Sequence, residues 1–255
     1  MCRDPDVAPR DIVGVIELDP ALTLKVLRLC NSPFYGIPLK VTTLRGAVVY
    51  LGADAIVNYV LAGCVASLYG SKSRRAQDTG EGWRHAVGAA VCAQVVAGRS
   101  DAPLGPLAFT CGLLHDIGKV LFDASDADEK LPVPPGAERH GLTFLEAERA
   151  AFGFDHAEAG AALAKHWSLP EEIVESIRWH HDPVGASHHH RLVCLVHVGN
   201  VLSVSLGLGL GGDGLSGLLQ PDALETLGVT VEELLAFGAD VDAKIKAAIA
   251  TFQTA

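Results

Sequence analysis

Apolar residues recur at three- and four-residue spacing along almost the whole chain, and this periodicity most limits what the chain can fold into. The pattern is clear in residues 11–17, 21–30, 44–50 and 54–69. No run alternates apolar and polar residues over a useful strand length, and aromatic residues make up only 6% of the chain. Side chains at this spacing share one face of an α-helix, whereas a half-buried strand needs a two-residue period. The sequence therefore predicts an all-α fold of roughly a dozen short helices.

Breaks in the periodicity suggest how the chain is organised. The polar segment 71–82 (SKSRRAQDTGEG) separates an N-terminal helical subdomain, residues 1–70, from a helical core, residues 83–206. Further helices are expected over 207–255, and all three parts should form one integrated domain. In the core, one apolar helix should run from Phe109 to Phe122. Other helices are expected at 142–151, 155–167, 170–181, 190–206 and 230–250, with an exposed insertion at 123–141.

Charge and cysteine usage exclude several classes of protein. The chain carries 20 basic and 30 acidic residues, a formal net charge of −10, so it is a poor candidate for a general nucleic-acid binder. Its six cysteines form no CxxC pair and lie mostly in apolar runs, which favours reduced core thiols and a cytoplasmic protein. The N-terminus is polar, and the glycine-broken apolar stretch 198–212 contains Asn200 and serines, so neither a signal peptide nor a membrane span is expected.

His115 and Asp116 stand side by side in an otherwise apolar run, GLLHDIGK (112–119). Burying an imidazole and a carboxylate costs free energy unless both are paired or bound. Adjacent residues on a helix point about 100° apart, so these two do not simply bond each other. A metal ion that accepts both side chains removes the cost. A purely structural pairing with neighbouring groups is the alternative.

Other polar residues within helices or at their ends can complete such a site, because a helical bundle can bring them together in its core. The candidates are His85, His156, His180, His181 and Asn200. Each also has a structural alternative: histidines near helix ends interact with the helix dipole, and a core asparagine makes hydrogen bonds. The run 188–190 consists of three histidines after a Pro/Gly loop, and we expect it to face solvent because successive residues cannot easily converge on one ion.

The whole chain resembles the HDOD family, the HD-related output domains of bacterial signalling proteins. In the first half the resemblance lies in IELDPALTLKVLRLCNSPFYG (16–36) and KVTTLRGAVVYLGADAI (40–56). In the second half it lies in WRHAVGAA (83–90), AFTCGLLHDIGK (108–119), GFDHAEAGAALAKHWSLPEEIVESIRWHHDP (153–183) and LVHVGN (195–200). It covers residues from about 10 to 206. The resemblance implies an N-terminal helical subdomain packed on an HD-like helical core.

HDOD proteins are related to HD phosphohydrolases and to HD-GYP cyclic di-GMP phosphodiesterases, and this relation implies a role for each candidate. His85 matches the first metal-ligating histidine of those enzymes, and His115 with Asp116 matches their His-Asp pair. Lys119 matches the lysine one turn later. The resemblance extends to the next histidine (His156), the paired histidines (His180, His181) and the final ligand, where Asn200 stands in place of an Asp. The GYP loop is absent after residue 183.

These matches imply a divalent metal, Fe, Mn, Zn or Ni, and possibly two ions. We expect a cytoplasmic signal-transduction module that acts through contacts with partner proteins and binds metal in an HD-type pocket. The alternative is a metal-dependent phosphohydrolase acting on a nucleotide or cyclic dinucleotide, in which Asp116 would bridge two ions and Lys119 would stabilise phosphoryl charge. A third reading is a metal-free scaffold. The neutral amide of Asn200, a weaker ligand than a carboxylate, counts against the enzyme.

Overall fold

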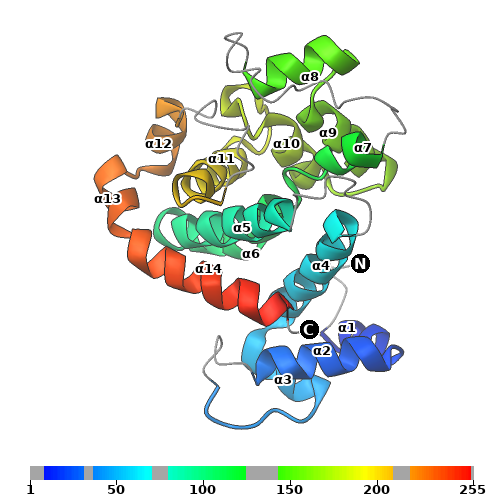
Figure 1. The fold of residues 1–255 in the computed structure, drawn as a ribbon. Coiled ribbons are helices and arrows are strands. Elements are labelled where there is room, and N and C mark those ends of the chain that lie inside the picture. Colours follow the sequence, from blue (N-terminus) through cyan, green and yellow to red (C-terminus); the bar gives the residue numbers. More distant parts are fainter. Residues whose placement is uncertain (1–8, 32–36, 71–79, 125–142, 209–218, 254–255) are drawn as a thin grey trace. The chain divides into compact units, whose positions relative to one another are not determined.

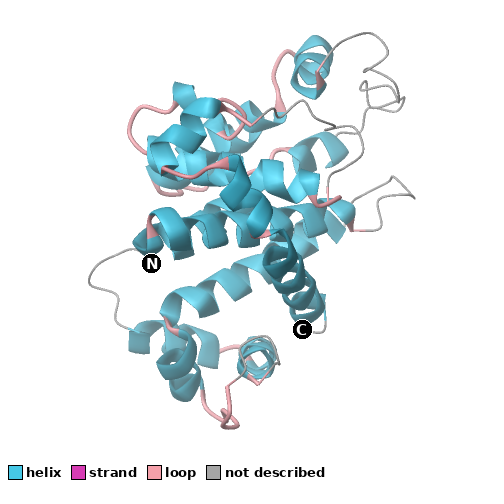
Figure 2. Cartoon of the chain, turned by 90° about the vertical axis from the view of Figure 1, so that its left-hand side faces the viewer, coloured by secondary structure: helices cyan, strands magenta, loops and turns pink. Residues whose placement is uncertain are grey.

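The protein is described here from a computed structural model, which describes residues 9–31, 37–70, 80–124, 143–208 and 219–253. Every regular element in these ranges is helical (Figure 2), which confirms the all-α prediction for the described residues. Contacts divide the chain into two compact units: residues 1–64 with 243–255, and residues 65–242. The predicted insertion at 123–141 and most of the segment 71–82 lie outside the described residues.

The first unit contains α1 (Pro9–Glu17), α2 (Pro20–Cys30), α3 (Leu44–Leu51), the start of α4 (Ala53–Gly70) and most of α14 (Gly238–Gln253). Asp19 precedes the proline that starts α2, and its Oδ1 accepts a hydrogen bond from the Leu22 N–H at 3.1 Å. The hydrophobic core of this unit includes Val26, Leu29 and Ile56, all fully buried.

Asn31 ties the end of α2 to the segment that leads into α3. Its amide nitrogen donates to the carbonyls of Leu27 at 2.7 Å and Val41 at 2.8 Å, and its Oδ1 accepts from the Val41 N–H at 2.9 Å. One side chain therefore joins the last turn of α2 to both backbone groups of Val41.

In the second unit, α5 (Glu81–Ser100) packs between α6 (Gly105–Leu114) and α11 (His190–Ser205), as Figure 1 shows. Small residues allow this close approach. A Cβ on Gly112 of α6 would lie 2.8 Å from the Ala90 Cα, and a Cβ on Gly199 of α11 would lie 2.7 Å from the Ala89 carbonyl oxygen. Because the contacting atoms belong to the backbone of α5, only glycine fits at these two positions.

Shorter helices complete this unit. The pair α9 (His156–His166) and α10 (Glu171–Trp179) packs together, and α7 (Lys119–Ala124) packs on α9. Capping boxes at Thr143 and Asp155 start α8 (Phe144–Phe152) and α9. The remaining helices of this unit are α12 (Pro221–Leu227) and α13 (Val231–Ala236), with short 3₁₀ turns at Ala102–Leu104 and Pro183–Gly185, and only the first turn of α14 belongs to it.

Two predicted helices are interrupted in the structure. The helix expected from Phe109 to Phe122 ends at Leu114, and α7 begins only at Lys119. Between them, hydrogen bonds of the 3₁₀ type, between residues three apart, join the Ile117 N–H to the Leu114 carbonyl and the Lys119 N–H to the Asp116 carbonyl. These bonds tighten the chain into a turn. The helix expected at 230–250 is likewise split into α13 and α14, and α12 is a further helix within 207–255, where helices were expected without bounds.

Among the described residues, no single helix combines the length and hydropathy required to cross a bilayer. α3 and residues 53–66 of α4 reach that requirement only when counted together, and the two segments are bent by 107°.

Glu175 of α10 holds the chain that leads into α11. Its carboxylate accepts hydrogen bonds from the backbone N–H groups of Ser187 (2.6 Å), His188 (3.1 Å) and His189 (2.7 Å). Burial alone would raise the pKa of Glu175, but these hydrogen bonds outweigh it and lower the pKa from its ordinary value. The carboxylate thus satisfies three consecutive backbone donors that lie just before α11 begins.

We therefore expect Glu175→Gln to destabilise the protein by about 2 kcal/mol at about pH 7, the usual contribution of hydrogen bonds to a charged group. A carboxyl whose pKa is lowered by folding stabilises above its unfolded pKa, and this contribution disappears as the pH falls through its folded pKa. The difference from wild type in urea unfolding should therefore shrink at about pH 3. Glu171→Gln, at an exposed position of the same helix, should behave as wild type. A difference that persists unchanged in acid would contradict the assignment.

Candidate metal centre

Asp116 lies at the centre of a buried polar cluster in the second unit. Its Oδ2 is 3.4 Å from His85 Nε2 and 3.4 Å from His115 Nε2, and it accepts a hydrogen bond from Lys119 Nζ at 2.8 Å. Its Oδ1 is 3.2 Å from His156 Nε2 and 3.6 Å from His180 Nε2. Each carboxylate oxygen therefore faces its own pair of imidazole nitrogens.

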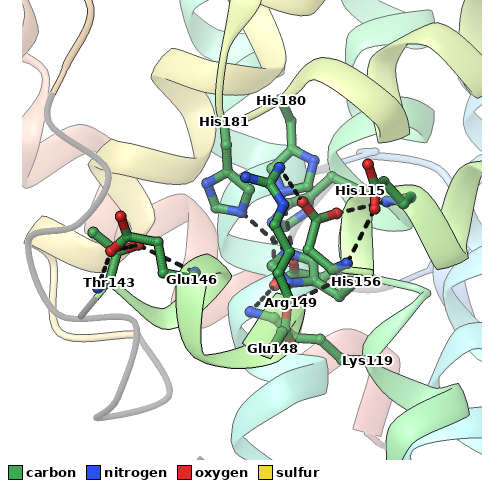
Figure 3. A network of polar contacts seen from close by, with 12 residues as sticks. His115, Lys119, Thr143, Glu146, Glu148, Arg149, His156, His180 and His181 are labelled. Carbon is green, nitrogen blue, oxygen red and sulfur yellow. Dashed lines mark hydrogen bonds and ion pairs between the residues drawn. The ribbon is translucent and has the colours of Figure 1, made fainter. Parts of the chain in front are cut away.

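The potential ligands form two groups that share Asp116. Within each group the ligand atoms lie within 4.8 Å of one another, and the groups consist of His85, His115 and Asp116, and of Asp116, His156, His180 and His181. In the first group, two Nε2 atoms are 3.3 Å apart; in the second, the Nε2 atoms of His156 and His181 are 3.0 Å apart. Figure 3 shows His156, His180 and His181 gathered together, with Glu148 beside them. Two imidazole nitrogens this close share either one proton or one metal ion.

The opposite nitrogen of four of these rings is fixed by a neighbouring oxygen. Donation from Nδ1 keeps the Nε2 lone pair directed at the cluster, as in metal sites whose histidines are oriented by outer hydrogen bonds. The pairs are His85–Ser203 Oγ at 3.3 Å, His115–Gly112 O at 2.7 Å, His156–Glu148 Oε2 at 2.7 Å and His180–Ile177 O at 2.8 Å.

Glu148 was not identified from the sequence. It is buried in α8 and holds His156 twice, because the same Oε2 also accepts the backbone N–H of His156 at 2.9 Å. The spacing of the two residues gives no helical or motif signal, since a turn and the start of a new helix separate them. The cost of burying a lone carboxylate is the only indication the sequence could offer.

Two polar atoms of the cluster have too few partners. Asp116 Oδ1 and His180 Nε2 are buried, they are 3.6 Å apart, and neither makes a hydrogen bond with the described residues. Buried polar atoms are seldom left in this state because desolvation is costly. A metal ion that accepts both atoms would resolve it, so the residues present fit a metal.

Burial governs the protonation states of most of these groups. It lowers the pKa of His115 well below its ordinary value, against the opposing charge of Asp116, and it does the same for His181. Burial alone would raise the pKa of Asp116, but His115 and Lys119 outweigh it and hold the pKa of that carboxyl well below its usual range. An ionised carboxylate among neutral imidazoles is the state that binds metal.

His156 is the exception among the cluster histidines. Burial and the charge of Lys119 lower its pKa, but its contacts with Asp116 and Glu148 outweigh both and raise the pKa to about 9. Without metal this ring is therefore an imidazolium, protonated on both nitrogens, at neutral pH. A bound ion would have to displace the proton on Nε2.

Two glycines bring α9 against the Asp116 turn. Gly118 lies so close to α9 that a Cβ there would be 2.0 Å from the His156 carbonyl oxygen and 2.6 Å from the Gly160 nitrogen. A Cβ on Gly160 would in turn lie 3.1 Å from the Gly118 nitrogen. The first residue of α9 is His156, so this backbone contact sets the distance between its imidazole and Asp116.

The structure brings six of the seven predicted ligands together and places Lys119 beside them. The seventh, Asn200, is buried in α11, and its role as a ligand stays a prediction. His197, one turn before it, has a structural role: its Nδ1 donates to the His180 carbonyl at 2.8 Å, and its Nε2 accepts the Gln220 N–H at 3.0 Å.

The expectation that residues 188–190 face solvent is met only in part. The side chain of His188 is 76% exposed, whereas His190 is half-buried and lies against Asp222. The reason is that α11 begins at His190, and its first turn packs on α12 rather than pointing into solvent.

Comparisons with known proteins identify relatives in sequence and fold. The structure of an HDOD domain protein of unknown function from Geobacter sulfurreducens is similar with a TM-score of 0.81 and 29% sequence identity, over 98% of this chain and 87% of that chain. A provisionally named signal transduction protein from Marinobacter aquaeolei VT8 also has a TM-score of 0.81, at 22% identity, over 99% of this chain and 56% of its own. The latter likeness shows the fold alone.

A curated relative, an uncharacterized protein of Treponema pallidum (strain Nichols), is 29% identical over 181 residues, which are 71% of this chain and 35% of that protein. The chain thus spans about a third of the curated relative it matches. The family model described as HDOD domain matches residues 1–183, a range that includes His85, Asp116 and the paired histidines and ends before Asn200. The chain therefore belongs to the HDOD domain family.

Proposed function

We propose that this chain is a signal-transduction module that binds two divalent transition-metal ions in the cluster around Asp116 and acts through contacts with other proteins. The observation that carries the metal proposal is the division of Asp116, whose two oxygens face different pairs of imidazoles. A carboxylate so placed can bridge two ions about 3.5–4 Å apart. Five imidazoles and one carboxylate suit Fe, Mn, Zn or Ni better than Mg or Ca.

Elemental analysis of tag-free protein, purified without added metal or chelator, tests this proposal. The wild type should contain close to two ions per chain, and His115→Ala/Asp116→Ala should contain almost none. His166→Ala removes an exposed histidine at the end of α9 and should keep the wild-type content. Equal metal in the double variant and the wild type, with both folded by circular dichroism, would refute the site.

Exposed apolar side chains in the first unit support the proposal of protein contacts. Among the described residues, six large hydrophobic side chains between positions 15 and 50 are exposed, including Leu18 at 84% and Val49 at 80%. Surfaces of this kind often mark protein interaction sites. A photo-crosslinker introduced at Val49 in the native host should capture one discrete partner, and one at exposed Trp167 of the second unit should not.

A specific observation also favours a metal-dependent phosphohydrolase as second candidate. Lys119 Nζ lies beside Asp116 and 5.4 Å from the Phe144 ring centroid, so a positive charge is held next to the candidate metal ligands. Two ions in this cluster would neutralise a phosphodiester and activate a water molecule. Lys119 would then stabilise the charge that develops on the phosphoryl oxygens. A provisionally named phosphohydrolase from Shewanella amazonensis SB2B shares the fold, at 24% identity and a TM-score of 0.72.

Activity of metal-loaded protein on bis(p-nitrophenyl) phosphate and on cyclic di-GMP would separate the two candidates. For an enzyme, Lys119→Met should reduce kcat roughly 100-fold, as expected for loss of one group that stabilises a transition-state oxyanion, while the metal content stays unchanged. If protein that holds two ions turns over neither compound, the enzyme is excluded and the regulatory role remains.

A further inference from the structure

A second group of potential ligands lies at the junction of α11 and α12 and shares no residue with the Asp116 cluster. It consists of His190, Cys194 and Asp222, whose ligand atoms lie within 4.8 Å of one another. His190 and Cys194 are four residues apart on α11, and Asp222 and Thr226 are four residues apart on α12. Side chains at this spacing share a helix face, so two pairs of polar side chains face each other across the packed helices.

His190 Nε2 lies at the meeting point of this junction. It is 3.0 Å from Asp222 Oδ2, 3.2 Å from Thr226 Oγ1 and 3.5 Å from Cys194 Sγ. The opposite nitrogen, Nδ1, lies 2.9 Å from the Pro183 carbonyl oxygen, which can only accept a hydrogen bond. The proton of the neutral ring therefore resides on Nδ1, and the Nε2 lone pair points at the other groups.

The convergence leaves an acceptor without a partner. Asp222 Oδ2 is buried and makes no hydrogen bond with the described residues. An unprotonated Nε2 cannot donate to that oxygen, so the nitrogen lone pair and the carboxylate lone pairs face each other at 3.0 Å. A cation between the two atoms would turn this repulsion into attraction, as a proton would do more weakly.

We infer that His190, Cys194 and Asp222 form a second, mononuclear site for a zinc-like divalent cation. Nitrogen, sulfur and oxygen ligands from these three residue types are those that Zn²⁺ takes, and Thr226 or a water would complete a tetrahedron. The thiolate distinguishes this site from the sulfur-free Asp116 cluster. The ion would fasten α12 to the start of α11, which makes its role structural.

Binding would release one proton. Burial raises the pKa of Cys194 to about 11, so the residue is a thiol at neutral pH, and a metal–sulfur bond forms as the S–H proton leaves to solvent. The affinity for metal should therefore rise with pH.

Cobalt(II) titration of chelator-stripped full-length protein tests the inference, because thiolate ligation gives a near-ultraviolet charge-transfer band that histidine and carboxylate ligation does not. We expect the band to appear in wild type and to be lost in Cys194→Ser. It should persist in Cys64→Ser, which alters an exposed cysteine, and in His115→Ala/Asp116→Ala, which lacks the other cluster. No band in folded wild type saturated with cobalt, or a band that survives in Cys194→Ser, would overturn the site.

A milder variant covers the case in which Cys194→Ser does not fold, because Cys194 is buried. The side chain of Asp222 is 47% exposed, so Asp222→Asn should leave the fold intact. It should weaken cobalt binding, followed through the same band, by roughly tenfold or more. Unchanged affinity in this variant would show that Asp222 is not a ligand and would reduce the junction to a hydrogen-bonded contact.

Discussion

Asp116→Asn should remove both ions from the cluster in one step, because one carboxylate serves both groups of ligands. His85→Ala should remove only the ion held by His85 and His115, since Asp116, His156, His180 and His181 remain as a complete second group. Under identical loading, elemental analysis should thus give close to two ions for wild type, one for His85→Ala and none for Asp116→Asn. The loss of affinity in Asp116→Asn should be roughly 100-fold or more.

The same substitution should also destabilise the metal-free protein. Lys119 is buried and its Nζ donates to Asp116 Oδ2, so the neutral amide leaves a buried ammonium without its counter-charge. Circular dichroism must therefore accompany the metal analysis. Two ions in folded Asp116→Asn, or loss of both ions from His85→Ala, would contradict the bridging role.

Gly118→Ala should destabilise the protein by about 3 kcal/mol, the upper range for forcing an extra methyl group into a packed site. The new Cβ would meet the backbone of His156 and Gly160, and backbone atoms cannot rotate away as a side chain can. α9 would have to move, and His156 would move with it. We therefore expect Gly118→Ala to lose the ion of the second group as well as stability, measured by urea unfolding and elemental analysis.

Gly98→Ala is the matched control. Gly98 lies in α5, and a Cβ there would meet nothing within 4 Å. Replacing a helical glycine with alanine at an unobstructed position stabilises a protein by about 0.4–1 kcal/mol. If both variants gained stability, the contact between Gly118 and α9 would not be as tight as described.

The sequence predicted the chemistry of the cluster better than its geometry. The cost of burying His115 beside Asp116 indicated a metal, and the resemblance supplied the other histidines. The break after Leu114 could not be foreseen, because apolar residues dominate the run from Phe109 to Phe122 on both sides of His115 and Asp116. The turn depends on a tertiary contact between Gly118 and α9. The spacing of apolar residues along the chain gives no information about such a contact.

Residues whose partners lie on other helices were missed for the same reason. Glu148 and the junction of His190 with Asp222 depend on helices that meet only in the folded protein. The role of Asn200 as a ligand came from its position in the motif and stays a prediction. Helical content, by contrast, follows from spacing that the sequence displays directly.

Four helices have one end at the Asp116 cluster. α6 ends just before His115 and α10 just before His180, so both direct their carbonyl ends toward the cluster. α7 begins at Lys119 and α9 at His156, so both direct their N–H ends toward it. Each end carries roughly half an elementary charge, negative at the carbonyl end and positive at the N–H end, so the four ends offset one another. The side chains therefore set the local field, and the ammonium of Lys119 already neutralises Asp116 before any cation arrives.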